Sequence, residues 1–213
     1  DISRVAVSVK PGLMPSLLIG STAAKTLAWL LKKPLIPIDH VEAHIAAATL
    51  ESEPIKLPAI GVVISGGHSH IFKLDKNMPM ICIGKTIDDA VGEAFDKAAT
   101  MLGLPWPGGP SIEKTAQDGN PDAYKFPIAS LKNPYDFSFS GVKTSLLYKI
   151  RGHPTGRGKN IVFPKSNEML SKSERADYAA SFQKSLVTTI LLRIKAVINN
   201  FPDIKTLVIG GGV

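Results

Sequence analysis

Short runs of β-branched and other apolar residues alternate along the chain with longer segments in which apolar positions recur at helical spacing. The strand-like runs fall at residues 3–9, 35–38, 59–64, 70–74, 80–84 and 207–209. The helical segments fall at residues 16–33, 40–52, 88–102, 111–117 and 171–199. Strands that alternate with helices are typical of sheets whose strands run largely parallel, so the pattern predicts an α/β fold.

Residues that favour helix ends support several of these boundaries. Ser16 is placed to cap a helix that Pro34 ends, and Asp39 is placed to cap the helix that follows it. Ser171, with Glu174 three residues later, forms a capping box before the longest helical segment. These signals predict the starts of three helices.

Composition narrows the class of protein. Because 44% of the 213 residues are hydrophobic, the chain can form a substantial core, which argues against intrinsic disorder. The single cysteine, Cys82, excludes an intramolecular disulfide and a cysteine-based zinc ribbon, and it indicates a reducing compartment. No stretch approaches about 18 uncharged apolar residues, so no transmembrane helix is expected. The chain begins in one strand-like run and ends in glycines directly after another, so we expect an internal piece of a longer protein.

Positive charge is concentrated in one stretch. The formal net charge is +7, and residues 143–175 hold eight Lys or Arg residues against two acids, so most of the excess lies there. Much of this stretch is rich in Gly, Pro, Ser and Asn and has little periodicity, which predicts a basic loop. Such a loop suits the phosphate backbone of a nucleic acid, although a merely solvated loop has the same composition.

His40 and His44 lie four residues apart on a predicted helix, so both imidazoles project from one face. This spacing suits two ligands of one transition metal, but a site needs a third ligand from elsewhere in the chain. Glu42 points away from that face, and it does not directly follow the first histidine as the acid of a zincin motif does. An ordinary pair of histidines without a metal therefore stays open.

Glycines follow predicted strands or turns at three places. These places are Ser65-Gly66-Gly67, Gly108-Gly109 and Gly210-Gly211-Gly212. Such glycines let backbone amides approach a phosphate, as in the nucleotide sites of sugar kinases and actin-like proteins. The sequence contains neither a Walker loop nor a Rossmann fingerprint, so those two nucleotide folds are excluded. An ordinary turn is the alternative for each glycine group.

Four carboxylates crowd the predicted helix in the middle of the chain. Asp88 and Asp89 are expected to serve its positive N-terminal end. Asp96 lies on the same side as Asp89 and Glu93, where it can present a carboxylate to ribose hydroxyls or to a cation. An exposed acidic face paired with Lys97 is the alternative.

A series of short motifs runs in a fixed order along the whole chain. The motifs are Lys10-Pro11-Gly12-Leu13 with Ser16-Leu17, His40-Val41-Glu42-Ala43-His44, Val63-Ile64-Ser65-Gly66-Gly67-His68, Asp88-Asp89-Ala90-Val91-Gly92-Glu93-Ala94-Phe95-Asp96-Lys97, Leu102-Gly103-Leu104-Pro105, Pro107-Gly108-Gly109-Pro110, Phe137-Ser138-Phe139-Ser140-Gly141-Val142-Lys143-Thr144 and Gly211-Gly212-Val213. Together they resemble the family of tRNA N6-adenosine threonylcarbamoyltransferases of the bacterial TsaD type, once described as glycoproteases. The whole string is far more specific than any single motif.

The resemblance implies an actin-like or sugar-kinase-like fold of two lobes, incomplete at both ends of this chain. Residues 1–85 and 200–213 would belong to a core lobe, and residues 86–199 to a helical second lobe. The resemblance also implies an acyl transfer on tRNA. A threonylcarbamoyl group would pass from threonylcarbamoyl-AMP to the N6 amine of the adenosine 3′ of the anticodon, in tRNAs that read codons beginning with A.

Site residues are implied by the same resemblance. His40 and His44 would be metal ligands for one divalent ion, iron in preference to zinc. The donor, or ATP or ADP, would be held by a set of residues around the glycine turns: Val63, Ile64, Ser65, Gly66, Gly67, Asp96, Gly109 and Glu113. No general base is identified in this chain. The catalytic residues are therefore left unassigned.

Partners and location are implied as well. The expected partners are tRNA, with residues 143–175 a candidate contact, a related dimerisation protein and a small ATPase of the same pathway. No membrane partner is expected. A bacterial cytoplasm is the expected location, and a mitochondrion is the alternative.

The chain departs from the family pattern at two points. Ala43 stands where glycine is usual, which a helix tolerates, and Ser69-His70 replaces the usual Thr-Gln beside the glycine turn. Three family features lie outside this sequence: an N-terminal strand with acidic residues, an Asn after the final Gly-Gly-Val, and a C-terminal Asp that completes the metal site. We therefore expect the chain by itself to be inactive.

Two other functions stay open at this point. A metal-dependent glycoprotein endopeptidase would use the same histidine pair, although Glu42 is not where a zincin needs its acid. A noncatalytic paralogue that serves as a dimerisation scaffold is the second. His40 and His44 argue against a scaffold, because the related scaffold proteins lack the metal histidines.

Overall fold

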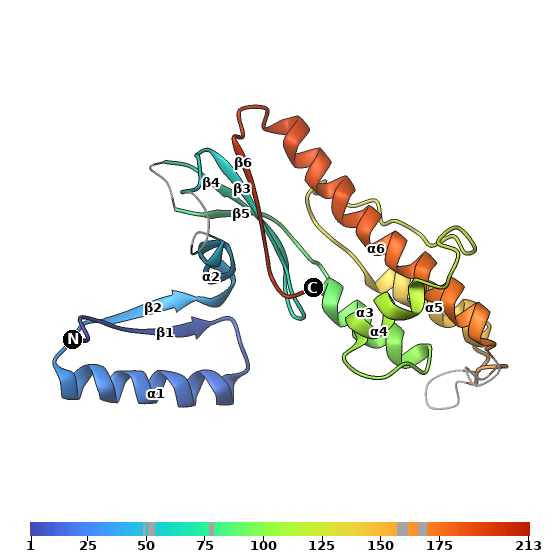
Figure 1. Cartoon of the computed structure of the whole chain (residues 1–213), viewed down its shortest axis with the longest axis horizontal. Helices are drawn as coiled ribbons and strands as arrows, with labels where there is room; N and C mark the ends of the chain where they lie inside the picture. The colour runs from blue at the N-terminus through green and yellow to red at the C-terminus, as the bar shows by residue number, and fades with distance from the viewer. Residues whose placement is uncertain (49, 51–53, 77–78, 157–161, 166–169) are drawn as a thin grey trace.

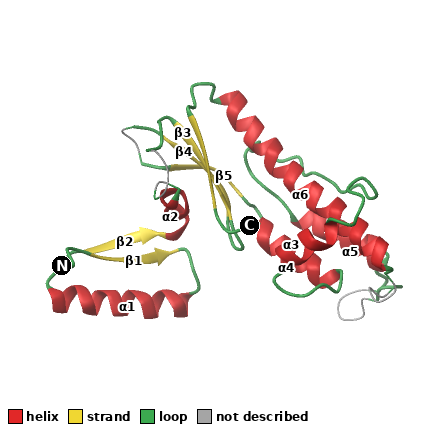
Figure 2. Ribbon diagram, viewed as in Figure 1, coloured by secondary structure: helices red, strands yellow, loops and turns green. Residues whose placement is uncertain are grey.

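The computed structural model describes residues 1–213 apart from 49, 51–53, 77–78, 157–161 and 166–169. A two-stranded sheet near the N-terminus, a four-stranded sheet at the centre and a group of packed helices follow one another across the molecule (Figure 1). Figure 2 shows one long helix lying along the two-stranded sheet and a separate group of helices beside the four-stranded sheet. The mixed α/β architecture expected from the sequence is confirmed.

The N-terminal unit is a β-α-β crossover. Strands β1 (Val5–Lys10) and β2 (Leu35–Asp39) pair in parallel, and helix α1 (Met14–Leu31) connects them. The expected cap at Ser16 is wrong, because the helix starts two residues earlier, where a proline in its first turn already has helical backbone geometry. Lys32 ends the helix in the left-handed conformation, with a φ of 51°.

The central sheet has the strand order β5-β4-β3-β6. Its strands are β3 (Ala59–Ile64), β4 (Ser69–Leu74), β5 (Ile81–Lys85) and β6 (Thr206–Gly210). The first three form the antiparallel meander predicted from the sequence, and β6 pairs in parallel with β3 from the far end of the chain. Every residue of β3 is buried, as expected for a central strand.

Helix α2 (His40–Ala47) starts directly after β2 because Asp39 caps it. As expected, the Asp39 carboxylate accepts hydrogen bonds from the backbone N–H groups of Val41 (2.8 Å) and Glu42 (3.3 Å). The helix ends well before residue 52, the end expected from the sequence, and residue 52 itself lies outside the described residues.

Two glycines let α2 pack closely against the central sheet. A Cβ on Gly61 would lie 2.4 Å from Cδ1 of Ile45, and a Cβ on Gly210 would lie 2.5 Å from the backbone oxygen of His44. The histidine-bearing helix therefore lies at the carboxyl end of β6. The carboxyl ends of the parallel strands β3 and β6 share that edge of the sheet, where ligands commonly bind in α/β folds.

The helical group packs around one apolar core in which Phe137, Phe139 and Phe182 are fully buried. It consists of α3 (Val91–Met101), α4 (Gly108–Ala116), α5 (Ser140–Arg151) and α6 (Lys172–Asn200). Helix α3 starts three residues later than expected and α4 starts three residues earlier. Within the described ranges, no helix is long and apolar enough to cross a membrane.

The starts of α5 and α6 differ in how visible they are in the sequence. The capping box at α6 is present as expected, with Ser171 and Glu174 bonded to each other's backbone N–H. Helix α5 has no counterpart among the expected elements. The Asp88 carboxylate, about 50 positions earlier, accepts hydrogen bonds from the backbone N–H groups of Phe139 and Ser140 at the start of this helix. No local cap signal therefore precedes the helix.

Candidate active site

A cavity of about 800 Å³ opens where the central sheet meets the helical group. Its walls come from α2, the turn between β3 and β4, α3, α4, α6 and the last two residues, Gly212 and Val213. Residues expected at the site that line this cavity are His40, His44, Ile64, Ser65, Gly66, Gly67, Asp96, Gly109 and Glu113. Segments far apart in the sequence thus meet around one space.

Val63 is the expected site residue that does not line the cavity. Its side chain is fully buried in a small core with Val41, Ile45, Phe72 and Val208. Successive residues of a strand point to opposite faces, so a side chain next to a cavity-lining residue on β3 faces away from the cavity. Val63 therefore packs α2 onto the sheet.

The glycine turn after β3 is held by its flanking residues. The Ser65 N–H donates to the backbone oxygen of His68 (2.8 Å), and the His68 N–H donates to the Ser65 hydroxyl (3.1 Å). This closed turn leaves Gly66 and Gly67 at the cavity. The backbone between the two closing residues can then present its polar groups to a ligand.

Four cavity glycines have no structural reason to be glycine. A Cβ on Gly66, Gly67, Gly109 or Gly212 would meet no neighbouring atom within 4 Å, and none of the four has a positive φ. Neither packing nor backbone strain therefore requires them. A Cβ at these positions would enter open space, and the absence of side chains leaves the backbone at the cavity accessible to a ligand.

Three imidazoles, those of His40, His44 and His68, line the cavity. The ring centroids of His40 and His44 are 4.7 Å apart, His68 lies 6.1 Å from His40, and His70 lies 5.6 Å from His68. Burial, followed by the charge of His40, lowers the pKa of both His44 and His68. At neutral pH these two rings are therefore uncharged and keep a lone pair for a ligand.

The donor set fits part of a metal site. Two imidazoles one helical turn apart suit a first-row transition ion. Among the described residues, no group of three or more His, Cys, Asp or Glu side chains has the arrangement to hold a metal. His40 and His44 thus offer two ligands, and the described part of the chain does not supply a full coordination shell.

Two carboxylates face the cavity from the helical side. Oδ1 of Asp96 accepts a hydrogen bond from the Gly108 N–H (2.8 Å), which ties α3 to the first turn of α4. Glu113 lies one turn further along α4 and lines the same cavity. Ribose hydroxyls are natural partners for such carboxylates, and the Gly109 N–H at the start of α4 lies beside them.

Asp88 and Asp89 do not serve the N-terminal end of α3, contrary to expectation. Asp88 instead accepts bonds at the start of α5, from the hydroxyls of Ser138 (2.6 Å) and Ser140 (2.7 Å) and from the Phe139 N–H (2.8 Å). Asp89 pairs with Lys97, the partner named in the alternative, but its side chain is largely buried and does not belong to an exposed face. The physical reason is that α3 receives its cap from the glycine turn, which leaves both carboxylates to other partners.

The apolar wall of the cavity was not apparent from the sequence. Leu186, Val187 and Ile190 of α6 line it together with Gln183. Their spacing of three and four residues places them on one helix face, but the same spacing also describes core residues. His68 was missed as well, although its position directly after the glycine turn is a usable signal.

The described parts of the basic stretch lie outside the cavity. Some of its cations have internal partners: the Arg151 guanidinium stacks over Phe163 (4.9 Å), and Lys149 lies over Phe126 (5.9 Å). Residues 157–161 and 166–169, which belong to the same stretch, lie outside the described residues.

Comparison with known proteins identifies the family. A family model described as TsaD, tRNA N6-adenosine threonylcarbamoyltransferase, matches residues 1–213. Proteins of that name are similar to the whole chain: 42% identical in Chlamydia trachomatis serovar A, 43% in Chlamydia muridarum and, over 212 residues, 40% in Endomicrobium trichonymphae. The chain spans 61%, 60% and 58% of the lengths of these relatives. The match over every residue shows that this chain belongs to the tRNA N6-adenosine threonylcarbamoyltransferase family.

Proposed function

We propose that the whole protein containing this chain transfers a threonylcarbamoyl group from threonylcarbamoyl-AMP to the N6 amine of the adenosine 3′ of the tRNA anticodon. One observation carries the proposal: a histidine pair and a glycine turn open into the same cavity. An activated donor of this kind has an acyl end and a nucleotide end. The cavity offers different chemistry for each.

The nucleotide half of the donor would lie against the glycines and the helical wall. The amides around Gly66, Gly67 and Gly109 would bind the phosphate, as glycine turns and helix N-termini do. Asp96 and Glu113 would accept hydrogen bonds from ribose hydroxyls. The apolar face of α6 would take the flat base, which prefers a dry surface. ATP or ADP would use the same contacts.

The acyl half would lie toward the imidazoles. His40 and His44 would hold a divalent ion, iron in preference to zinc, which when bound supplies Lewis-acid polarisation of the threonylcarbamoyl group. The chain's own residues orient the donor at both ends, so that the weakly nucleophilic adenine amine meets a fixed carbonyl. The glycine amides would stabilise the AMP that leaves with the negative charge.

The remaining expectations are part of the same proposal. We infer an actin-like, two-lobed whole protein in which residues 1–85 and 200–213 belong to one lobe and residues 86–199 to the other. The pairing of β6 with β3 supports that division, because it joins a strand from residues 1–85 to a strand from residues 200–213 in one sheet. A bacterial cytoplasm is the proposed location, with a mitochondrion as the alternative.

Partners belong to the proposal too. Transfer RNA would contact residues 143–175, where positive charge is concentrated. A related dimerisation protein and a small ATPase of the same pathway would complete the system. Neither a glycoprotein endopeptidase nor a noncatalytic scaffold is favoured: Glu42 is exposed and absent from the cavity lining, and both histidines face the cavity.

The test uses the full-length protein with its partner proteins. The mixture receives threonylcarbamoyl-AMP and an unmodified tRNA, and digested tRNA is analysed by mass spectrometry for threonylcarbamoyladenosine. A tRNA with guanosine at the acceptor position is the matched control. We expect the modified nucleoside only with the adenosine-containing tRNA. Absence of product from both tRNAs would contradict the proposal.

A further inference from the structure

The start of α3 and the glycine turn form one hydrogen-bonded unit. The N-cap residue of α3, Ala90, offers no side-chain bond. Instead the Val91 N–H donates to the buried hydroxyl of Ser69 (3.0 Å), and the Glu93 N–H donates to the backbone oxygen of Gly66 (3.0 Å). The position of the turn at the cavity therefore depends on the position of α3.

Helix α3 also fixes the start of α4. Besides the bond from Asp96 to the Gly108 N–H, the two backbones touch: a Cβ on Gly108 would lie 2.4 Å from Cα of Asp96. Gly109 and Glu113 follow in α4 and line the cavity. A displacement of α3 would thus move the glycine turn, Asp96 and the start of α4 together.

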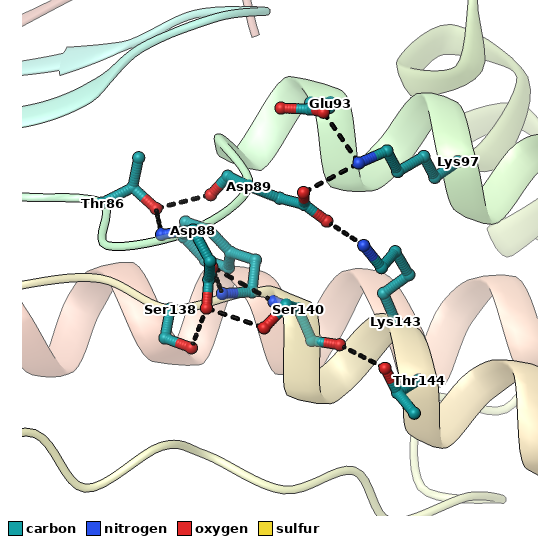
Figure 3. Close-up of polar contacts among 10 residues, drawn as sticks. Thr86, Asp88, Asp89, Glu93, Lys97, Ser138, Ser140, Lys143 and Thr144 are labelled. Atoms are coloured by element: carbon teal, nitrogen blue, oxygen red, sulfur yellow. Dashed lines mark hydrogen bonds and ion pairs between the residues drawn. The ribbon is translucent and has the colours of Figure 1, made fainter.

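A carboxylate outside the cavity clamps α3 to α5. Asp89 precedes the N-cap of α3, and its side chain is only 13% exposed. One oxygen pairs with Lys97 of α3 (2.7 Å) and the other with Lys143 of α5 (Figure 3). Lys97 also pairs with Glu93 (2.7 Å), in the first turn of the same helix. The clamp therefore acts at the end of α3 that carries the glycine turn.

The ion pair of Lys143 with Asp89 conflicts with the expected role of this lysine as a tRNA contact. Lys143 opens the basic stretch expected to meet tRNA, yet its ammonium is occupied by Asp89 and its side chain is only 21% exposed. A cation paired in this way is poorly available to a phosphate backbone. Lys143 is, however, well placed to hold α3 against α5. Without it, the largely buried Asp89 carboxylate keeps only one of its two cations, which leaves its negative charge less well stabilised.

We propose that Lys143, by way of Asp89, is a positioning residue for the nucleotide half of the cavity rather than a tRNA contact. The inference rests on the proposed function, because it assumes that the cavity binds an adenine nucleotide. Loss of Lys143 loosens the start of α3, so the glycine turn and Asp96 no longer hold the nucleotide in place. Affinity for tRNA is unaffected.

The test compares four forms of the full-length protein: wild type, Lys143→Met, Lys143→Arg and the control Lys184→Met. Lys184 is an ordinary exposed lysine of α6 that pairs with Asp122, at 50% and 75% side-chain exposure. The measurements are the Kd for AMP by calorimetry, the Kd for tRNA by filter binding, and KM and kcat for threonylcarbamoyl-AMP. Circular dichroism checks the fold of each variant.

We expect Lys143→Met to raise the AMP Kd and the KM about tenfold, with the tRNA Kd and kcat within about twofold of wild type. Lys143→Arg restores the AMP Kd, because it keeps the charge beside Asp89, and Lys184→Met changes nothing. The inference is contradicted if Lys143→Met leaves the AMP Kd unchanged, or if it raises the tRNA Kd instead of the AMP Kd.

Two further outcomes are separable. If Lys143→Met fails to fold, Lys97→Met is measured instead, because it removes the other cation from the same carboxylate, and an unchanged AMP Kd there overturns the inference. If the wild type binds no AMP, both the proposed function and this inference are wrong. If the wild type binds AMP and modifies tRNA but Lys143→Met binds AMP equally well, only the inference is wrong.

Discussion

Gly92 and Gly66 touch backbone to backbone, so that a Cβ on Gly92 would lie 2.6 Å from Cα of Gly66. The first turn of α3 thereby sits directly beneath the glycine turn of the cavity, and the Glu93 N–H donates to the Gly66 backbone oxygen between them. The two elements can approach this closely only because Gly92 has no side chain. The contact connects the fold of the helical group to the shape of the cavity.

A methyl group at this contact is therefore expected to damage stability and binding together. Gly92→Ala forces the turn and the helix apart, at a cost of about 1–3 kcal/mol in the free energy of unfolding, as overpacking does. Urea unfolding of the full-length protein measures this cost. A variant as stable as wild type, with unchanged AMP affinity, would show that the contact has room to relax.

Gly109→Ala separates binding from stability. Alanine favours a helix more than glycine by up to about 1 kcal/mol, so the free energy of unfolding stays level or rises, while AMP affinity falls about tenfold because the methyl enters the cavity. Gly141→Ala is the matched control: Gly141 is also the second residue of a helix with free space at Cβ, but it does not line the cavity. Equal AMP affinity in the two variants would argue against a phosphate beside Gly109.

Metal content tests the histidine pair. His40→Ala and His44→Ala each remove one imidazole, so each full-length variant is expected to lose bound iron or zinc. The expected fall in metal affinity is more than about tenfold, the fall that loss of an outer-shell partner causes. Mass spectrometry of the metal per chain measures the loss. His153, whose ring lies 4.9 Å from that of Tyr148 and which does not line the cavity, provides the control His153→Ala. Full metal content in both cavity variants would contradict the assignment.

The pKa of Asp88 predicts an acid-sensitive contribution to stability. Burial alone would raise this pKa, but the bonds from Ser138, Phe139 and Ser140 together outweigh burial and lower it. A lowered carboxyl pKa gives stability that is fully present above the unfolded-state pKa of about 3.9 and is lost as pH falls through the folded-state pKa.

Asp88→Ala should accordingly reduce the free energy of unfolding at neutral pH by about 1 kcal/mol, the typical cost of losing a helix cap. The difference from wild type should shrink as the pH falls below about 3.9 and through the lower folded-state pKa, because the carboxylate of the folded wild-type protein then becomes protonated. Urea unfolding at neutral pH and at a pH below the folded-state pKa of Asp88 measures this difference. The variant Asp122→Ala is the control, because Asp122 is exposed. An equal difference at both pH values would show that the carboxylate charge is not what caps α5.

The parts of the fold that were predicted correctly have local causes. Asp39 and Ser171 cap the helices that directly follow them, and the meander is encoded by three short apolar runs. Helix α5 escaped prediction because Asp88, which bonds its first turn, lies far away in the sequence. No short-range pattern carries such a contact.

The same distinction applies to the cavity. The glycines and histidines could be predicted because they belong to motifs that follow one another in a fixed order, although their spacing alone left other roles open. Leu186 and Ile190 look like any residues of an amphipathic helix, and only the packing of α6 places them on the cavity. Asp88 and Asp89 were predicted to serve the start of α3, because the sequence does not show that the glycine turn already caps that helix. Asp88 bonds the start of α5 instead, and Asp89 pairs with two lysines.

The most direct test of a single cavity with an acyl end and a nucleotide end compares two ligands on two variants of the full-length protein. His40→Ala should weaken threonylcarbamoyl-AMP about tenfold and leave the AMP Kd within about twofold of wild type, whereas Gly67→Ala should weaken both ligands alike. Calorimetry gives all the Kd values. If His40→Ala weakened both ligands equally, or neither, the imidazoles and the glycine turn would not hold opposite ends of one donor.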